Sequence, residues 1–308
     1  MPQPEPEPLG PDSLTWKYFG DWRGVLLALW AGSMQNMHPE LGAGVEEHSL
    51  FFAERWQRFY RSLYPIGGVV YDEPRARATA LQVRGYHNAI GGVDACGRRY
   101  HALNPATYYW AHATFFMVTL LVADRLGPGL SDAEKRTLYE EHKQWYRLYG
   151  VSERPMPPDW DSFLRYYERM CTEVLEDNKA TRDVLDIDAL PKPPSVAFLP
   201  DAAWRLLRVP VARGFVWLTV GMYHPAVRER LGYSWSATDE RVHRILGRAI
   251  HYGWQLLPFR LRYHPRARAG WLRAAGKLPA DHPPVETPAR NLPPLDERGD
   301  PKHYCPAL

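Results

Sequence analysis

One histidine stands in the most apolar stretch of the chain: His112 lies within residues 108–123, a run made mainly of aromatic and aliphatic residues. A neutral imidazole presents one nitrogen as a donor and the other as an acceptor or metal ligand, so a buried helical histidine is either hydrogen-bonded or bound to a metal. On a helix, Tyr108, Phe115 and Phe116 share its face. This apolar wall would suit haem iron, whereas a core histidine held by hydrogen bonds is the simpler interpretation.

Two further side chains with binding chemistry precede this run. Arg84 and His87 are three residues apart and share one face of an expected helix over residues 73–90. A guanidinium can hold a carboxylate, such as a haem propionate, through two parallel hydrogen bonds, and His87 could be a hydrogen-bond donor or a second axial ligand. The alternative is a surface salt bridge beside a core imidazole.

His38 and His48 flank a glycine-containing segment, which follows an expected apolar helix over residues 26–37. We expect this segment to be a turn, because glycine lets the backbone approach a ligand closely. The alternative is a plain helix stop and connector.

Several common chemistries are disfavoured by the absence of their motifs. The sequence has no G-x-S-x-G elbow, no phosphate-binding Walker loop, no H-E-x-x-H pair and no dinucleotide-binding glycine motif after a strand. Its three cysteines form no C-x-x-C pair, which argues against a disulfide framework, a zinc knuckle and covalent haem attachment.

Helix signals dominate between two proline-rich ends. Asn104 and Pro105 predict the start of the His112 helix, and capping boxes begin at Ser131 and Ser236. Asp159 is expected to cap a helix to about residue 176, and residues 92–103 form the one plausible β-hairpin. The fold class is therefore all-α, with one helical domain over residues 13–277, a disordered tail over 1–12 and a proline-rich tail over 278–308.

The net charge of +3 is unevenly distributed, because residues 241–277 hold nine Arg or Lys and no Asp or Glu. This basic segment is either solvated helix surface, a contact for anionic lipid or a neighbour of haem propionates. No nucleic-acid-binding motif accompanies it. The amino terminus lacks a signal-peptide pattern and no apolar run reaches about 20 residues, so we expect a cytoplasmic protein, peripheral to a membrane at most.

Several ordered motifs together resemble the mpaB-type and rubber-oxygenase catalytic domain family. They are GPDSLTWKYFGDWRG at 10–24, QxMHPxxGAGVxxHS at 35–49, VRxxH at 83–87, GG at 91–92, GxxYxALNP at 97–105 and WAHAT at 110–114. The resemblance covers about residues 10–275. It implies an all-α fold, a non-covalent b-type haem, His112 as the proximal iron ligand and Arg84 on a helix over the haem.

The resemblance also implies a function: oxidative cleavage or oxygenation, with dioxygen, of an apolar and possibly isoprenoid or lipid-like substrate. His87 stands where latex-clearing proteins are expected to carry a distal lysine–threonine pair, which disfavours rubber itself as substrate. Glu46, Glu47 and His48 are candidates for a distal acid or base. A non-catalytic helical protein that binds lipid or haem is the alternative. The sequence leaves the oligomeric state open.

Overall fold

Helices build most of the structure, a computed structural model that describes residues 5–303 apart from 52 and 189. The α-helices are α1 Leu14–Tyr18, α2 Ala28–Asn36, α3 Pro39–His48, α4 Arg55–Tyr71, α5 Ala76–Gly85, α6 Pro105–Arg125, α7 Asp132–Leu148, α8 Trp160–Arg169, α9 Lys179–Leu185, α10 Asp201–Met222, α11 Pro225–Arg230, α12 Ala237–Gln255, α13 Phe259–Arg262 and α14 Pro265–Ala274. Shorter helical turns are η1 Trp22–Leu27, η2 Met170–Val174, η3 Pro194–Val196, η4 Ala289–Asn291, η5 Leu295–Glu297 and η6 Pro301–His303. Two antiparallel strands, β1 Gly91–Val93 and β2 Arg99–His101, form the expected hairpin. The prediction of an all-α fold with one hairpin is confirmed.

The predicted helix starts are also confirmed. The Asn104 side chain accepts a hydrogen bond from the Ala106 amide, and Pro105 opens α6. Ser131 and Ser236 each form a complete capping box, with Glu134 and Asp239 as the reciprocal partners. These local signals set the boundaries because they satisfy amide groups that the first helical turn leaves without partners.

The prediction of a turn between His38 and His48 is wrong, because this segment is helix α3. His38 is extended and Pro39 occupies the first helical position, which favours a helix start. Gly42 serves close packing rather than a turn: a Cβ there would lie 2.6 Å from the Asn36 carbonyl oxygen. The glycine therefore lets α3 pack tightly against the end of α2 and against Asn178, which precedes α9.

Two other predicted helices differ in extent. The helix expected over residues 73–90 is limited to α5, and turns follow it up to the hairpin. The helix expected over residues 26–37 is α2, preceded by the 3-10 turn η1. Both helices pack against the core, since Val83 of α5 and Trp30 of α2 are buried.

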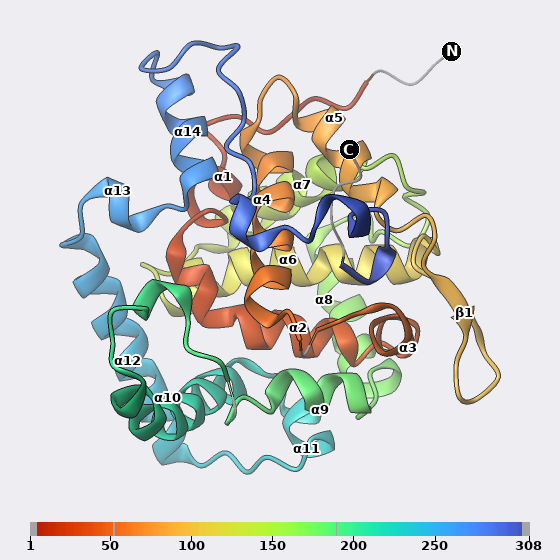
Figure 1. The fold of residues 1–308 in the computed structure, drawn as a ribbon, viewed down its shortest axis with the longest axis vertical. Helices are drawn as coiled ribbons and strands as arrows, with labels where there is room; N and C mark the ends of the chain where they lie inside the picture. Colours follow the sequence, from red (N-terminus) through yellow and green to blue (C-terminus); the bar gives the residue numbers. More distant parts are fainter. Residues whose placement is uncertain (1–4, 52, 189, 304–308) are drawn as a thin grey trace.

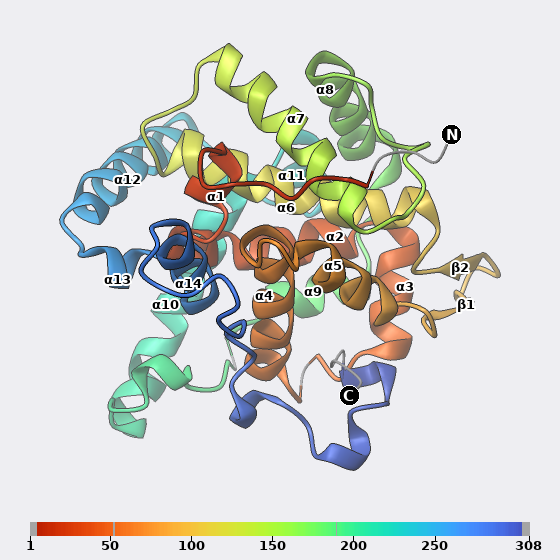
Figure 2. The ribbon, with the colours of Figure 1, turned by 90° about the horizontal axis from the view of Figure 1, so that it is seen from above.

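Helix α6 runs through the middle of the molecule, with α7 on one side and α2 on the other (Figure 2). It is the one helix in the described part of the chain with the length and composition of a membrane span, and 78% of its most apolar window is buried inside the protein. Its side chains therefore supply the core around which α1, α2 and α7 pack.

The carboxy-terminal segment lies against α4 (Figure 1). Arg61 of α4 donates to the Asn291 carbonyl at 3.1 Å, and His303 is hydrogen-bonded to Glu54 at 3.0 Å. At the other end, the Trp16 indole donates to the Leu9 carbonyl at 2.9 Å. Both proline-rich ends thus have irregular segments that contact the helical body, while residues 1–4 and 304–308, including Cys305, lie outside the described residues.

Candidate functional site

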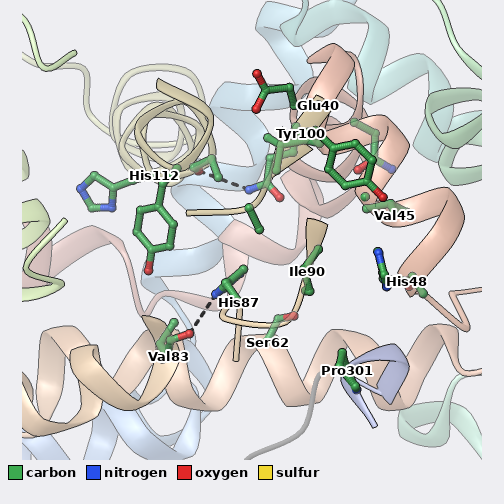
Figure 3. A pocket seen from close by; sticks show the side chains of 18 of the residues that line it. Glu40, Val45, His48, Ser62, Val83, His87, Ile90, Tyr100, His112 and Pro301 are labelled. Atoms are coloured by element: carbon green, nitrogen blue, oxygen red, sulfur yellow. Dashed lines mark hydrogen bonds between the residues drawn. The ribbon is translucent and has the colours of Figure 1, made fainter. Parts of the chain in front are cut away.

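A cavity of about 140 Å³ lies between the central helices, where sequence analysis expected a binding pocket (Figure 3). Helices α2 to α6 and the hairpin contribute its walls. The lining side chains with binding or acid–base chemistry are Gln35, Asn36, Glu40, His48, Arg58, His87, Tyr100, Tyr108, His112 and Tyr149. Of the predicted site residues, the structure brings His48, His87, Tyr108, His112 and Phe115 to this cavity.

His112 forms the part of the wall that separates the cavity from α7. Its ring lies 4.7 Å from the Trp145 ring and 5.6 Å from the Tyr149 ring, both measured between centroids. In Figure 3 the imidazole projects from α6 on the side away from His87, His48 and Tyr100. The residue is 2% exposed. Burial lowers the pKa of His112 to about 3, against the opposing effect of its hydrogen bond to the His142 carbonyl.

The hydrogen bonding of His112 defines which nitrogen has a lone pair. Its Nε2 lies 3.3 Å from the His142 carbonyl oxygen, and a carbonyl can only accept, so Nε2 carries the proton. Nδ1 is then the unprotonated nitrogen, and it is buried without a hydrogen-bond partner among the described residues. A neutral imidazole with one nitrogen fixed by a carbonyl and the other bearing a lone pair is the form that binds metals.

His142 of α7 is the partner that the sequence analysis missed. Its ring stacks on that of His112, with centroids 4.5 Å apart and planes 14° apart. Burial lowers the pKa of His142 well below its ordinary value, and the neighbouring His112 lowers it further. Its Nε2 lies 3.2 Å from the Tyr109 hydroxyl. The signal in the sequence was the buried stripe of α7, in which His142 stands among aromatic residues as His112 does in α6.

His87 occupies the middle of the cavity lining in Figure 3. Its Nδ1 donates to the Val83 carbonyl at 2.9 Å, which leaves Nε2 as the acceptor nitrogen. Burial lowers the pKa of His87 to about 4, while that hydrogen bond acts in the opposite direction. The Tyr108 ring, 5.5 Å away between centroids, lies against it. His87 is therefore a neutral polar group in an aromatic environment.

The acid–base candidates of α3 are placed differently from one another. His48 lines the cavity, and its Nε2 donates to the Gly91 carbonyl at 3.3 Å. Glu47 accepts a short hydrogen bond from the Tyr100 hydroxyl. Glu46 accepts from the Ala180 amide at 3.0 Å, at the start of α9. Glu46 and Glu47 are thus engaged in holding neighbouring elements, and the described cavity lining includes neither of them.

Arg84 and Phe116 lie outside the described lining of the cavity. The Arg84 guanidinium donates to the Tyr149 and Gly150 carbonyls, each at 3.2 Å, at the end of α7. Phe116 packs on the α7 side of α6, 4.6 Å from the His142 ring. Arg58 of α4 is the cation that lines the cavity, and it donates to the Ser62 hydroxyl at 2.5 Å. Nothing in the sequence pattern distinguished Arg58 from the other arginines of α4.

A second cavity of about 260 Å³ adjoins the first and shares Arg58, Ile66 and Phe115 with it. The side chains of η1, α2 and α4 that line it are mainly apolar, with Trp22, Ala31 and Leu63 among them. Ligand sites for molecules of drug size usually measure roughly 300–1,000 Å³. The two adjoining cavities together reach this range, whereas the space beside His112 alone does not.

The side chains offer no cluster that could hold a bare metal ion, but they offer an axial ligand for a haem iron. No group of three or more His, Cys, Asp and Glu side chains that could hold a metal ion occurs among residues 5–303 with the two gaps noted above. A haem brings four nitrogen ligands of its own and needs one or two axial protein ligands. The buried lone pair of His112 and the aromatic surroundings fit that requirement.

Comparison with known proteins identifies the class of protein. The sequence model of the family described as ER-bound oxygenase mpaB/B′/rubber oxygenase, catalytic domain, matches residues 16–252. The chain therefore belongs to this family, and the resemblance noted in the sequence is confirmed over that range. The family is one of oxygenases, which supports an oxidoreductase activity in general. Searches of curated proteins and of solved structures gave no significant match.

Proposed function

We propose that this protein is a haem-dependent oxygenase that acts with dioxygen on an apolar, isoprenoid-like or lipid-like substrate. The observation that carries the proposal is the buried His112 of α6, a helix that lines the cavity; its Nδ1 has a lone pair and no hydrogen-bond partner among the described residues. Membership in an oxygenase family supports the reaction class. When bound, haem would supply the redox chemistry with dioxygen.

The protein's own residues would have distinct tasks in that reaction. His112 would hold the iron through Nδ1, and the His142 carbonyl would keep the ring in the required tautomer by accepting from Nε2. Because burial keeps His112 neutral, protons do not compete for the ligand nitrogen at ordinary pH. The aromatic side chains on either side would exclude water from the cofactor.

The second cavity would receive the substrate. Its mainly apolar lining favours a hydrocarbon chain, and it adjoins the His112 cavity at Phe115 and Ile66. A chain lying there would place a double bond next to the reacting centre. His87 and His48 are the polar groups that would orient the reacting oxygen or move a proton.

Arg58 is the side chain best placed to hold an anionic group at the junction of the two cavities. It lines both of them, and a guanidinium can bind a carboxylate through two parallel hydrogen bonds. This assigns to Arg58 the role that sequence analysis expected of Arg84, whose guanidinium instead donates to carbonyls at the end of α7.

A visible spectrum tests the proposal directly. Protein purified from cells supplied with a haem precursor is expected to show a Soret band and a haem-to-protein ratio near one. Oxygen uptake on addition of short polyisoprenoid alcohols then distinguishes an oxygenase from a passive haem carrier. Protein that stays colourless even after incubation with haemin would contradict the proposal and would leave the alternative of a lipid-binding protein.

A further inference from the structure

Helix α12 carries three separate stripes of side chains. His243, Gly247 and Trp254 face the protein; His243 is buried and hydrogen-bonded to the Leu218 carbonyl at 3.2 Å, and a Cβ on Gly247 would lie 2.3 Å from the Arg125 carbonyl oxygen. The spacing of these residues by four and by seven positions places them on one side of the helix. Ile250 is partly buried against the core, and most of the remaining helix surface is exposed.

The two outward stripes differ in character. Arg241, Arg244 and Arg248 follow each other at three and four residues and are all exposed. Beside them run apolar and aromatic side chains with the same periodicity and with high exposed fractions: Val242 47%, Ile245 58%, Tyr252 67% and Leu256 86%. We call these seven residues the α12 face. An exposed apolar stripe next to a cationic stripe is the pattern of a helix that lies in a membrane interface.

Neighbouring helices on this side of the molecule also expose large apolar side chains. Helices α10, α12 and α13 lie along the same side of the molecule in both orientations (Figures 1 and 2). Leu206 of α10 is 79% exposed, and Leu261 of α13 is 53% exposed. Large apolar side chains exposed together on one side of a protein mark an interaction surface more often than isolated ones do.

The positive charge around the α12 face favours an anionic partner. Of the nine cations in residues 241–277, Arg266 and Arg273 are turned inward toward Asp72, while Arg260 of α13 is exposed like the arginines of α12. The nearest acid on α12 is Glu240, 3.8 Å from Arg244 and 3.4 Å from Arg125. A second copy of this chain would bring like charges together, which opposes association, whereas an anionic surface would attract them.

A hollow beside the α12 face adds a site for a headgroup. It measures about 550 Å³ and is bordered on one side by α12 and on the other by the end of α6 and the following loop. Arg125, His243, Arg244, Arg248, His251 and Asp124 are among its lining residues. Three guanidinium groups around one hollow suit a phosphate, because each can donate two parallel hydrogen bonds to its oxygens.

We propose that the α12 face docks on an anionic phospholipid surface. The apolar stripe enters the boundary between headgroups and acyl chains, and the arginines contact phosphates. This inference rests on surface residues only and does not depend on the proposed haem or on the reaction. It gives a physical route by which a substrate of low solubility in water reaches the protein.

Vesicle flotation of the full-length protein tests the proposal. Phosphatidylcholine vesicles are compared with vesicles that also contain phosphatidylserine, in dilute and in physiological salt. Binding is expected only with the anionic lipid and is expected to weaken as salt rises, because screening shortens the range of the attraction. The combined variant Arg241→Gln, Arg244→Gln, Arg248→Gln is expected to lower the partition coefficient by on the order of a hundred-fold.

The apolar stripe is tested separately by Ile245→Ser, Tyr252→Ser, Leu256→Ser, for which we expect a loss of at least about ten-fold. The matched charge control is Arg154→Gln, Arg165→Gln, Arg169→Gln, since these arginines are also exposed and Arg165 and Arg169 belong to α8. The apolar control is Leu295→Ser, at a side chain that is 70% exposed. Both controls are expected to bind vesicles as the unaltered protein does.

Three results would overturn the proposal. One is the absence of binding to anionic vesicles in dilute salt. Another is equal binding by the α12 charge variant and its control. The third is a dimer, measured by sedimentation, that the Ser variants convert to monomer, because the α12 face would then belong to a second copy of the chain. Since none of these measurements uses haem, they stay informative if the proposed oxygenase function fails.

Discussion

Titratable side chains are buried where α6 packs on α7, and they are exposed on the α12 face. His112 and His142 are buried, stacked on each other and held neutral because burial lowers the pKa of each. Arg241 and Arg248 are exposed and keep their charge in contact with solvent. The first arrangement preserves a nitrogen lone pair for ligation, and the second preserves a charge for attraction at a surface.

The comparison also shows that a basic segment in a sequence need not be a basic surface. Arg266 belongs to the same cation-rich segment as Arg241, yet it is buried and donates to Asp72 from Nε at 3.0 Å. Asp72 accepts in addition from the Thr79 hydroxyl at 3.0 Å. This buried pair joins α14 to the end of α4, so part of the segment serves the core and part serves the surface.

Removing Asp72, the buried partner of Arg266, should give the largest change in stability. Asp72→Ala is expected to lower the free energy of unfolding by about 3–5 kcal/mol, because it leaves the Arg266 charge buried without its acceptor. Urea denaturation measures this. The control is Asp161→Ala, which removes the partner of exposed Arg136 and should have little effect on stability, because solvent screens such a pair. Similar losses in both variants would show that burial does not separate the two kinds of arginine.

The next largest effect is on haem content and concerns His112, the proposed iron ligand. His112→Ala is expected to reduce haem content by on the order of a hundred-fold, since even partners of a ligand account for about ten- to a hundred-fold in affinity. The haem-to-protein ratio measures it, with circular dichroism as a check on folding. Phe116→Ala on the same helix is the matched control, because it removes a buried ring outside the cavity lining. Full haem retention by His112→Ala would direct attention to His87.

The neutral state of the histidine stack predicts a dependence of stability on pH. His142 has a folded pKa below its unfolded value of about 6.5, so the unfolded chain takes up a proton first and stability falls as pH drops below that value. Between pH 7 and pH 5 this single group costs about 2 kcal/mol. In His142→Phe the loss over that range should therefore be smaller by about that amount.

Urea denaturation at both pH values gives the comparison, and it can be made on protein without added haem. His101→Phe, at an exposed position on β2, is the control and should leave the pH dependence unchanged. If His142→Phe lost as much stability between pH 7 and pH 5 as the unaltered protein, His142 would be protonated in the folded state, and the neutral stack would be the wrong description.

Much of the fold could be predicted because its signals are local. Asn104, Ser131 and Ser236 each satisfy amides of the helix that they begin, so their sequence context was sufficient. The segment after His38 was misjudged because glycine is permissive in turns and also necessary for close packing. The contacts of Gly42 with the Asn36 carbonyl and with Asn178, far along the chain, show that the glycine serves close packing, and the local sequence gives no sign of the second contact.

The candidate site was predictable in part for the same reason. His112 was recognisable from its own apolar run, whereas its stacking on His142 depends on how α6 and α7 pack. Arg58 lines both cavities because of the course of α4, and its local sequence gives no indication of this. Residues that act within one helix could thus be found, while partnerships between helices required the structure.

The smallest expected effect concerns Arg84, and it tests whether Arg84 or Arg58 holds the cofactor. Its two hydrogen bonds to the Tyr149 and Gly150 carbonyls stabilise the end of α7, where a positive charge is also favourable to the helix dipole. Both hydrogen bonds come from Nη1. Lysine keeps the charge but is shorter than arginine and cannot place its nitrogen at the same point, so Arg84→Lys should lower the free energy of unfolding by about 1 kcal/mol or less. Haem content should stay unchanged, and it should fall in Arg58→Lys, which alters the guanidinium that lines the cavity. If haem were lost from Arg84→Lys and retained by Arg58→Lys, the role predicted for Arg84 from the sequence would be the correct one, and the side chain would have to leave the carbonyls of α7 when the cofactor binds.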